Sequence, residues 1–495
     1  MTTRPNLLLI TTDQQRGDCL GCDGHPVLET PYLDQLAERG TRFRHAYTSV
    51  PSCTPARAGI LTGMDQWNHG RLTMAGSDAL EYPATLPGEL ARAGYHTQAV
   101  GKMHHAPQRR LYGFHHMVLD ESGRRDSGFI SDYHLFFEQH KDGPYGYRDH
   151  SIDWNSWMAR PSHLPEHLHP SHWTASRGIE FLQQRDPTKP FFLWLSFARP
   201  HSPYDPPQAY YDLYIDNPNV PEPVVGDWAN RYDRPVADVN APRTRRSDDE
   251  IHRARAAYYG NITFIDHQIG RVLYELQKRD PSALNTLMLF TSDHGDMMGD
   301  HHHWRKTYAY EGSARIPLLL SCPRDWGLGE AQVQEAPVEL RDIMPTFLEA
   351  AGVDIPDSVD GRSLLGLVRG TEGEGEEWRS FVQGEHTTCY DREHGMQYLT
   401  DGREKYIWFH HTGEEQFFDL STDPGECTDL SKDPSVASRL QSWRRRLAEI
   451  DENRGDPRGR DGELVVQPQG ALALSPNYQR WRERALALEA GPVEG

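Results

Sequence analysis

The chain of 495 residues has no long apolar run. The longest extends from Phe191 to Ala198, far below the roughly 18 to 20 residues that a membrane-spanning helix needs. The apolar stretch near the start, Leu7 to Ile10, is too brief for the apolar region of a secretory signal. The sequence therefore predicts a soluble, cytoplasmic protein with no membrane partner.

Positive charge and paired cysteines are also scarce. Lysine and arginine number 52 against 72 acidic residues, which gives a formal net charge of −20. This balance argues against a nucleic-acid binder, because phosphate backbones require a positive field. The six cysteines are scattered from Cys19 to Cys427 without the spacing of a disulfide framework. An anionic substrate would have to meet a local positive pocket.

Strand-like and helix-like segments alternate along most of the chain, which predicts an α/β fold with a parallel or mixed sheet covered by helices on both faces. The predicted strands are Leu7–Ile10, Thr97–Val100, Phe191–Phe197 and Asn285–Thr291, and the predicted helices are Thr30–Arg39, Leu86–Ala93, Ile179–Arg185 and Glu250–Arg279. Two long insertions, 123–170 and 203–249, are expected to shape a pocket at the carboxyl ends of the strands.

The composition changes at an acidic and glycine-rich stretch, residues 371–377. After it, Arg379–Glu385, Gln397–Asp401 and Glu404–Phe409 alternate like strands, and Ser438–Ile450 has helical periodicity. We therefore predict a catalytic α/β domain over residues 1–374 and a small C-terminal α+β subdomain with a tail over residues 375–495.

Polar side chains directly follow two of the buried strands. Asp13 and Gln14 come after the first strand, and Asp293 and His294 come after Asn285–Thr291. Carboxylate and amide oxygens are ligands for a hard cation. Either pair alone is more often a turn or cap, so these residues carry weight only together with the motifs below.

The segment Ser52-Cys53-Thr54-Pro55-Ala56-Arg57, followed by Leu61-Thr62-Gly63, resembles the C-x-P-x-R and L-T-G signature of the type I, formylglycine-dependent sulfatases of the alkaline phosphatase superfamily. The resemblance implies that a formylglycine-generating enzyme converts Cys53 to an aldehyde, which hydrates to a geminal diol. It further implies that Arg57 holds this diol by charge-assisted hydrogen bonds.

Three further elements match the same family in the same order along the chain. Gly101-Lys102-Met103-His104 is similar to its G-K-x-H element, Pro200-His201-Ser202-Pro203 to its P-H-x-P element, and the segment from Lys306 to Pro317 to its lysine-containing stretch. The resemblance implies that Lys102 and Lys306 neutralise sulfate oxygens. His104 would take a proton from the diol, and His201 would assist the leaving oxygen.

The resemblance also implies one divalent metal ion, held by Asp13, Gln14, Asp293, His294 and one diol oxygen of the modified Cys53. Calcium is the common metal of sulfatases, whereas the imidazole ligand keeps manganese as an alternative. The expected fold is an alkaline-phosphatase-like mixed sheet between helices, and the C-terminal segment from Gln416 to Glu426 resembles the tail of the family.

The predicted activity is hydrolysis of a small anionic sulfate ester, as in an arylsulfatase. The pairs Asp13-Gln14 and Asp293-His294 differ from the usual sulfatase pattern and resemble the phosphonate monoester hydrolase and phosphodiesterase branch, which is the alternative. Against that branch, the segment from Arg71 to Gly76 lacks the asparagine expected there. A non-catalytic metal-binding relative is a second alternative. The long loops and the tail from Ala471 are compatible with a homo-oligomer.

Overall fold

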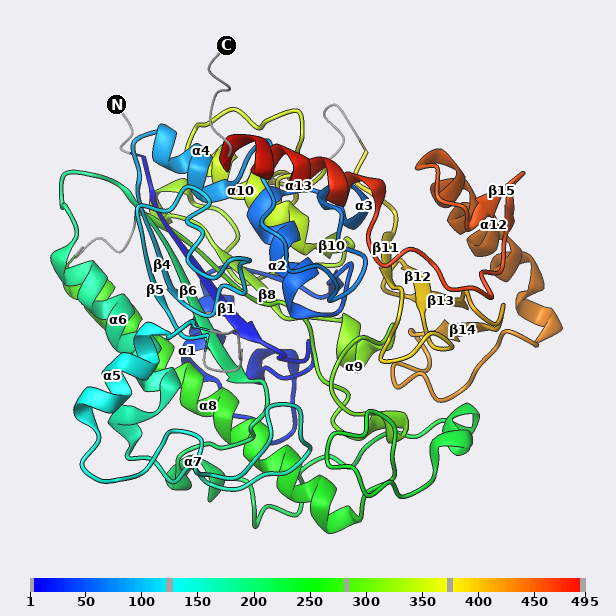
Figure 1. Cartoon of the computed structure of the whole chain (residues 1–495), viewed down its shortest axis with the longest axis horizontal. Coiled ribbons are helices and arrows are strands. Elements are labelled where there is room, and N and C mark those ends of the chain that lie inside the picture. Colours follow the sequence, from blue (N-terminus) through cyan, green and yellow to red (C-terminus); the bar gives the residue numbers. More distant parts are fainter. Residues whose placement is uncertain (1–3, 122–127, 280–284, 372–376, 490–495) are drawn as a thin grey trace.

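A computed structural model describes residues 4–121, 128–279, 285–371 and 377–489 (Figure 1). Within these ranges, the centre of the molecule is an eight-stranded sheet in the order β5-β4-β6-β1-β7-β8-β2-β9. β1 runs parallel between β6 and β7, and β8 is antiparallel to β7 and β2. The predicted mixed α/β sheet is thus confirmed. The strands are β1 (Asn6–Asp13), β2 (Thr41–Phe43), β4 (His96–Gly101), β5 (His116–Leu119), β6 (Phe191–Pro200), β7 (Thr286–Ser292), β8 (Leu318–Ser321) and β9 (Gln332–Gln334).

Helices cover both faces of this sheet. Because side chains alternate along a strand, Leu7 and Leu9 of β1 enter one core and Leu8 and Ile10 enter the other. The first core is closed by α2 (Cys53–Thr62), α4 (Leu86–Arg92) and α10 (Ile343–Ala350). The second is closed by α1 (Pro31–Glu38), α6 (Pro170–Gln184) and α8 (Asp248–Arg279). All four β1 side chains are at most 1% exposed, as expected for a central strand of such a sheet.

Two helical features differ from the sequence prediction. Helix α6 begins at Pro170, nine residues before the predicted start, because His169 caps it by accepting the Ser171 N–H and proline fits its first position. The insertion 123–170 contains helix α5 (Asp132–His140), which Ser131 caps. Its Phe137 packs with Leu164 and Leu168 in a small separate core, so tertiary contacts stabilise a helix that has little periodicity of its own.

The C-terminal part forms an antiparallel sheet of β11 (Val382–His386), β12 (Met396–Thr400), β13 (Glu404–Phe409) and β14 (Glu415–Asp419). Helix α12 (Ala437–Asn453) packs through Leu440 and Trp443 on one face of this sheet. The other face packs on Tyr47, Tyr308 and Tyr310 of the preceding part. The predicted small α+β unit is confirmed. Strand β14 was not predicted as a strand, because its residues overlap the segment from Gln416 that resembles the tail of the family.

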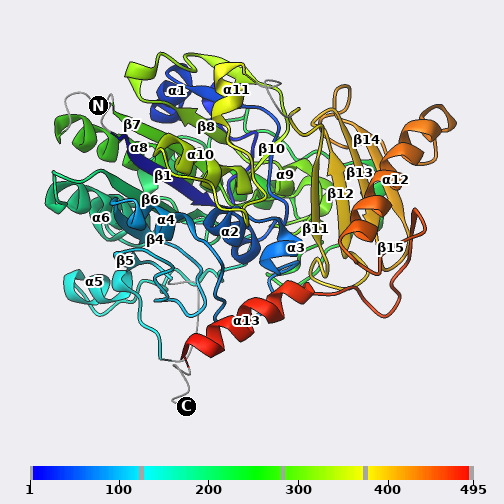
Figure 2. The ribbon, with the colours of Figure 1, turned by 90° about the horizontal axis from the view of Figure 1, so that it is seen from above.

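The chain then returns to the large sheet. Helix α13 (Pro476–Glu489) lies along α3 (Gln66–His69) (Figure 2), and its Tyr478 and Trp481 are buried in the same core as α2 and α4. The predicted boundary between residues 374 and 375 lies outside the described residues and stays a prediction. In the part of the chain that the structure describes, no helix has both the length and the apolar character needed to cross a membrane.

The remaining α-helices and strands are short: β3 (Ala46–Tyr47), α7 (Gln208–Tyr211), α9 (Glu311–Ala314), β10 (Val338–Glu339), α11 (Leu365–Arg369), β15 (Gly459–Arg460) and β16 (Glu463–Leu464).

Candidate active site

Four adjacent parallel strands end at one edge of the large sheet. Asp13 is the last residue of β1, Lys102 follows β4, His201 follows β6, and Asp293 follows β7 directly. In the sheet these strands are neighbours in the order β4-β6-β1-β7. Because parallel strands present their carboxyl ends on the same side, residues far apart in the sequence meet there.

The turn after β4 depends on a glycine. Gly101 has a φ of 95°, and a Cβ atom at this position would lie 1.9 Å from the Ser196 carbonyl oxygen, so only glycine fits. Beyond this turn, His104 also has a left-handed φ of 59°. Its backbone N–H and that of Met103 both donate to Oε1 of Glu121. Glu121 therefore fixes the backbone that carries His104, a contact that no sequence motif indicated.

Cys53 lies at the centre of the site, at the first turn of α2 and 1% exposed. Its Sγ is 3.2 Å from His294 Nε2, 3.2 Å from Lys306 Nζ, 3.5 Å from Asp13 Oδ1 and 3.9 Å from Lys102 Nζ. Burial and the Asp13 carboxylate raise the pKa of the thiol, but Lys102, Lys306 and His294 outweigh them and lower it. The site therefore favours negative charge at the position of this side chain.

The ligand atoms of Asp13, Cys53, Asp293 and His294 all lie within 4.8 Å of one another. His294 Nδ1–H donates to the Gly295 carbonyl, so Nε2 faces the cluster. Burial opposes a charge on this ring, but Asp293 and Cys53 outweigh burial and raise the pKa of His294, and a bound cation would displace the proton on Nε2. Nε2 lies 3.6 Å from both Asp13 Oδ1 and Asp293 Oδ1. Neighbouring ligands at right angles around a calcium-sized cation, each 2.3–2.6 Å from it, are about 3.3–3.7 Å apart. These spacings fit one hard cation.

Gln14 adds a further oxygen donor beside this cluster. Its backbone N–H donates to Asp293 Oδ1, and its side-chain Nε2 donates to Asp296 Oδ2. Its Oε1 is buried and has no hydrogen-bond partner among the described residues, a costly state that a bound cation would relieve. Gln14 also has a φ of 73°, backbone strain of the kind that accumulates at functional sites. Asp296, which orients this amide, was not predicted from the sequence.

Asp13 is fully buried and forms an ion pair with Lys102. Burial alone would raise its pKa, but the charges of Lys102 and Lys306 outweigh burial and hold the pKa of this carboxyl well below its usual range. The ion pair also affects Lys102. Burial alone would lower the pKa of its ammonium group, but Asp13 and Cys53 outweigh burial and raise this pKa. Both groups are charged at neutral pH.

Arg57 lies one turn along α2 from Cys53. Its Nε donates to Asp293 Oδ2 at 2.9 Å, and its Nη1 donates to Ser196 Oγ at 2.8 Å and to the Lys102 carbonyl. The observed hydrogen bonds of Arg57 thus orient a candidate metal ligand and the turn that carries Lys102. Its expected contact with a hydrated aldehyde at Cys53 stays a prediction.

His201 and Lys306 form a pair on the opposite side of Cys53. The Nδ1–H of His201 donates to the Ser202 carbonyl, and Lys306 Nζ donates to His201 Nε2 at 2.9 Å. Burial and the Lys306 charge lower the pKa of His201 well below its ordinary value, so its imidazole is neutral and Nε2 carries no proton. Lys306 rather than His201 therefore holds the transferable proton in this structure.

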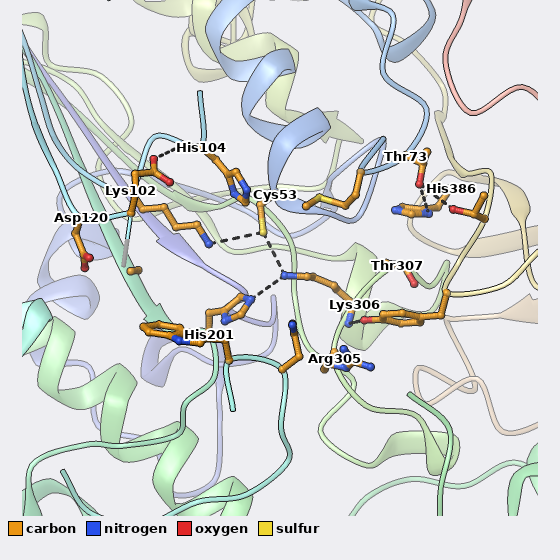
Figure 3. Close-up of a pocket in the computed structure, with 17 residues that line it drawn as sticks. Cys53, Thr73, Lys102, His104, Asp120, His201, Arg305, Lys306, Thr307 and His386 are labelled. Carbon is orange, nitrogen blue, oxygen red and sulfur yellow. Dashed lines mark hydrogen bonds between the residues drawn. The ribbon is translucent and has the colours of Figure 1, made fainter. Parts of the chain in front are cut away.

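Cys53, Lys102, His201 and Lys306 line a cavity of about 420 Å³ (Figure 3). In this view Lys102 and Asp120 lie on one side of Cys53, and Lys306 and Arg305 lie on the other. Several residues that line the cavity have no role in the sequence motifs, because they lie in loops between the motifs, in the C-terminal unit or, for Arg305, directly beside a motif lysine: Thr73, Asp120, Trp154, Asn155, Arg305, His386 and Tyr390.

His386 of β11 connects the small sheet to the nucleophile. Its Nδ1 accepts the Cys389 backbone N–H at 3.3 Å, so Nε2 carries the proton and donates to Ser52 Oγ at 3.0 Å. Ser52 directly precedes Cys53 and occupies the N-cap position of α2. Burial, with the charges of His294 and Lys306, lowers the pKa of His386 to about 3, so this donor arrangement persists across the physiological pH range. The C-terminal unit thus helps to hold the loop that presents Cys53.

Comparison with known proteins agrees with this geometry. Residues 5–353 match the sulfatase family, and residues 299–453 match the C-terminal family of N-sulphoglucosamine sulphohydrolase. The chain therefore belongs to the sulfatase family of the alkaline phosphatase superfamily and is a sulfuric ester hydrolase.

An arylsulfatase of Clostridium perfringens is 44% identical over 90% of this chain and 94% of its own length. A multifunctional alkaline phosphatase superfamily protein of Trinickia caryophylli is 30% identical over 89% of this chain and 94% of its own. Among solved structures, a phosphonate monoester hydrolase of Agrobacterium radiobacter has a TM-score of 0.75 at 25% identity, covering 91% of this chain and 96% of its own. The identity to an arylsulfatase favours sulfate ester hydrolysis over the non-catalytic alternative.

Proposed function

We propose that this protein is an arylsulfatase whose nucleophile is made from Cys53 by oxidation to formylglycine. The environment of Cys53 supports this proposal most directly. Two lysine ammonium groups and three candidate metal ligands lie around this single side chain. Such a site binds a sulfate group and stabilises the charge on its oxygens in the transition state. A hydrated aldehyde at this position supplies an attacking hydroxyl and a second hydroxyl whose deprotonation later expels sulfate.

The surrounding side chains would divide the remaining work. Lys102 and Lys306 neutralise the sulfate oxygens, and both approach the position of the nucleophile within hydrogen-bonding range. The attacking hydroxyl loses its proton to solvent and forms a new bond to sulfur as the bond between sulfur and the ester oxygen breaks. The departing alkoxide or phenoxide takes a proton that passes from Lys306 through His201, to which Lys306 donates. His104 then accepts the proton of the second hydroxyl. Overall, one water molecule is consumed, Lys306 regains its proton, and an alcohol, a sulfate dianion and one proton are released.

We further propose that Asp13, Gln14, Asp293 and His294 hold one divalent cation, with calcium as the expected ion and manganese as the alternative. The support is the unpartnered Oε1 of Gln14 together with the spacing of the other three ligands. When bound, such an ion polarises the sulfate oxygens and acidifies the attacking hydroxyl. Arg57 would keep Asp293 oriented for this role.

Two measurements test this proposal. Peptide mass spectrometry around Cys53 in protein from the native host should show conversion of the thiol to an aldehyde. A substrate panel of aryl, sugar and choline sulfates, measured beside phosphodiesters and phosphonate monoesters, should give the highest kcat/KM for an aryl sulfate. An unmodified thiol in fully active protein would refute the assignment of the nucleophile.

The same panel decides the alternative activity. The similarity to a phosphonate monoester hydrolase structure and the Asp13-Gln14 and Asp293-His294 pairs favour a secondary activity on phosphonate monoesters or phosphodiesters. A higher kcat/KM on those substrates than on every sulfate would make that activity the primary one. Modification by a formylglycine-generating enzyme, the cytoplasmic location and a homo-oligomer stay predictions.

A further inference from the structure

The cavity wall contains a cation that the reaction described above does not use. Arg305 lines the cavity and is 8% exposed. It forms no ion pair with a carboxylate anywhere in the described ranges, and its Nε is buried without a hydrogen-bond partner. Burying a guanidinium without a counter-ion is unfavourable. A protein retains such a group most readily where an anionic ligand completes its surroundings.

The position of Arg305 is fixed by the contacts of its backbone and side chain. Its N–H donates to Asp296 Oδ1 at 2.9 Å, and its carbonyl accepts the Met297 N–H at 2.7 Å. Its Nη2 donates to the Asn240 carbonyl, and its guanidinium carbon lies 4.5 Å from the centre of the Tyr390 ring. Its φ is 69°, so the fold tolerates backbone strain at this residue. The guanidinium is therefore held in place before any ligand arrives.

A second arginine, Arg243, shows what a structural role looks like. The guanidinium of Arg243 also lies over a tyrosine ring, 5.4 Å from the centre of Tyr308, but it forms an ion pair with Asp391 at 2.9 Å. Arg243 does not line the cavity. The two residues share their packing on an aromatic ring and differ in the counter-ion and in access to the cavity.

In the proposed reaction, Lys102 and Lys306 neutralise the sulfate that reacts, and both contact Cys53. Arg305 lies on the Lys306 side of the cavity, away from Lys102 and Asp120 (Figure 3). An anion that pairs with Arg305 therefore belongs to the alcohol part of the ester. The ring of Tyr390, which also lines the cavity, offers a flat surface for a planar group beside that anion.

Resting on the proposed function, we propose that the preferred substrates are aryl sulfates whose ring carries a second anionic group, and that Arg305 is the residue that selects them. A carboxylate or a sulfonate on the ring forms a charge-assisted hydrogen bond with the guanidinium. The acidic side chain of Asp120 on the other wall disfavours the opposite orientation of the same substrate.

The test compares matched esters in wild type, Arg305→Gln and Arg243→Gln. The esters are the 3- and 4-carboxyphenyl sulfates and the 3- and 4-sulfophenyl sulfates. Each is compared with the acetylphenyl sulfate that has the same substitution position and an uncharged ring substituent. The readout is the ratio of kcat/KM for the ester with the charged substituent to kcat/KM for the ester with the uncharged substituent. Comparing this ratio between variants cancels the different reactivities of the leaving groups.

We expect Arg305→Gln to lower the ratio at least about tenfold for one position of the charge, as befits the loss of a hydrogen bond to a charged group. Arg243→Gln should keep the wild-type ratio. An unchanged ratio in Arg305→Gln for all four charged esters overturns the proposal, as does an equal loss in Arg243→Gln. Comparison of the carboxylate and sulfonate series shows which anion is recognised.

A binding measurement separates this proposal from the proposed function. If wild type cleaves none of the sulfates, the arylsulfatase assignment fails, and Arg305 is then tested with the phenols 3- and 4-hydroxybenzoate as probes. Calorimetric titration should show at least about tenfold weaker binding to Arg305→Gln than to wild type and to Arg243→Gln. Equal binding to all three proteins overturns the assignment of Arg305.

Discussion

The contact between Lys306 and His201 predicts that these two residues act on the leaving group as one unit. Lys306 Nζ lies 2.9 Å from His201 Nε2 and 3.2 Å from Cys53 Sγ. His201 Nε2 accepts this hydrogen bond and carries no proton of its own. Loss of either residue therefore interrupts the same delivery of a proton to the departing oxygen.

The magnitudes follow from the roles of the two groups. Removing one positive donor from a transition-state charge costs about 10²- to 10³-fold in kcat, which we expect for Lys306→Met. Removing one partner in proton transfer costs about 10²- to 10⁴-fold, which we expect for His201→Gln. Independent effects would multiply to about 10⁴-fold or more, whereas a shared role leaves the double variant within about tenfold of the worse single variant.

The assay is kcat/KM for the four proteins of this cycle on aryl sulfates that differ in the pKa of the leaving phenol. Thermal unfolding of each variant controls for loss of the fold. Both single variants should lose more activity on poor leaving groups than on 4-nitrophenyl sulfate, because a good leaving group needs less help from a proton donor. Multiplicative losses in the double variant, or equal losses on all leaving groups, would refute the shared role.

Three further predictions concern the metal site and the C-terminal unit. Calcium or manganese should raise the melting temperature of wild type but not of Asp293→Asn, as followed by differential scanning fluorimetry after chelation; an equal shift in both would exclude this site. His386→Ala should lower kcat about five- to tenfold through the lost hydrogen bond to Ser52. The control is His410→Ala, because His410 is a buried histidine that directly follows β13 of the same sheet; equal losses would contradict the positioning role. Glu385→Gln should lower the free energy of unfolding at pH 7 by about 1.5–3 kcal/mol, because Arg454 and Arg458 lose charge-assisted hydrogen bonds to a shared buried carboxylate and keep only Asp451 and Asp456 as counter-ions.

The effect of Glu385 has a definite pH dependence. Burial raises the pKa of this carboxyl, but Arg454 and Arg458 outweigh burial and hold the pKa well below its usual range. Its stabilisation is therefore complete above the unfolded pKa of about 4.3 and is lost as the pH falls towards the lower folded pKa. Urea unfolding of wild type and Glu385→Gln at pH 7 and below pH 4 should show a smaller difference at the lower pH. A constant difference would contradict the ionic origin.

Much of the fold followed from local patterns. The apolar runs around Leu7–Ile10 and Phe191–Phe197 can be satisfied only as buried strands, and the alternation with helical segments fixed the class of the sheet. The start of α6 and the existence of α5 were missed, because a histidine cap and a small aromatic core stabilise them rather than their own periodicity. The return of α13 to the large sheet depends on the burial of Tyr478 and Trp481 far along the chain, which no local pattern reveals.

The sequence by itself determined the family and the residues most directly concerned with chemistry, because Cys53, Lys102, His201 and Lys306 each lie in a short contiguous motif. Only the tertiary structure decided how they act together. It shows that Lys306 donates a hydrogen bond to His201 and that Arg57 donates one to Asp293. It also places Glu121, Asp296, Arg305 and His386 at the site. The physical reason is that hydrogen-bond direction, burial and unpaired charge depend on neighbours from distant segments, and these neighbours are set by packing rather than by spacing along the chain.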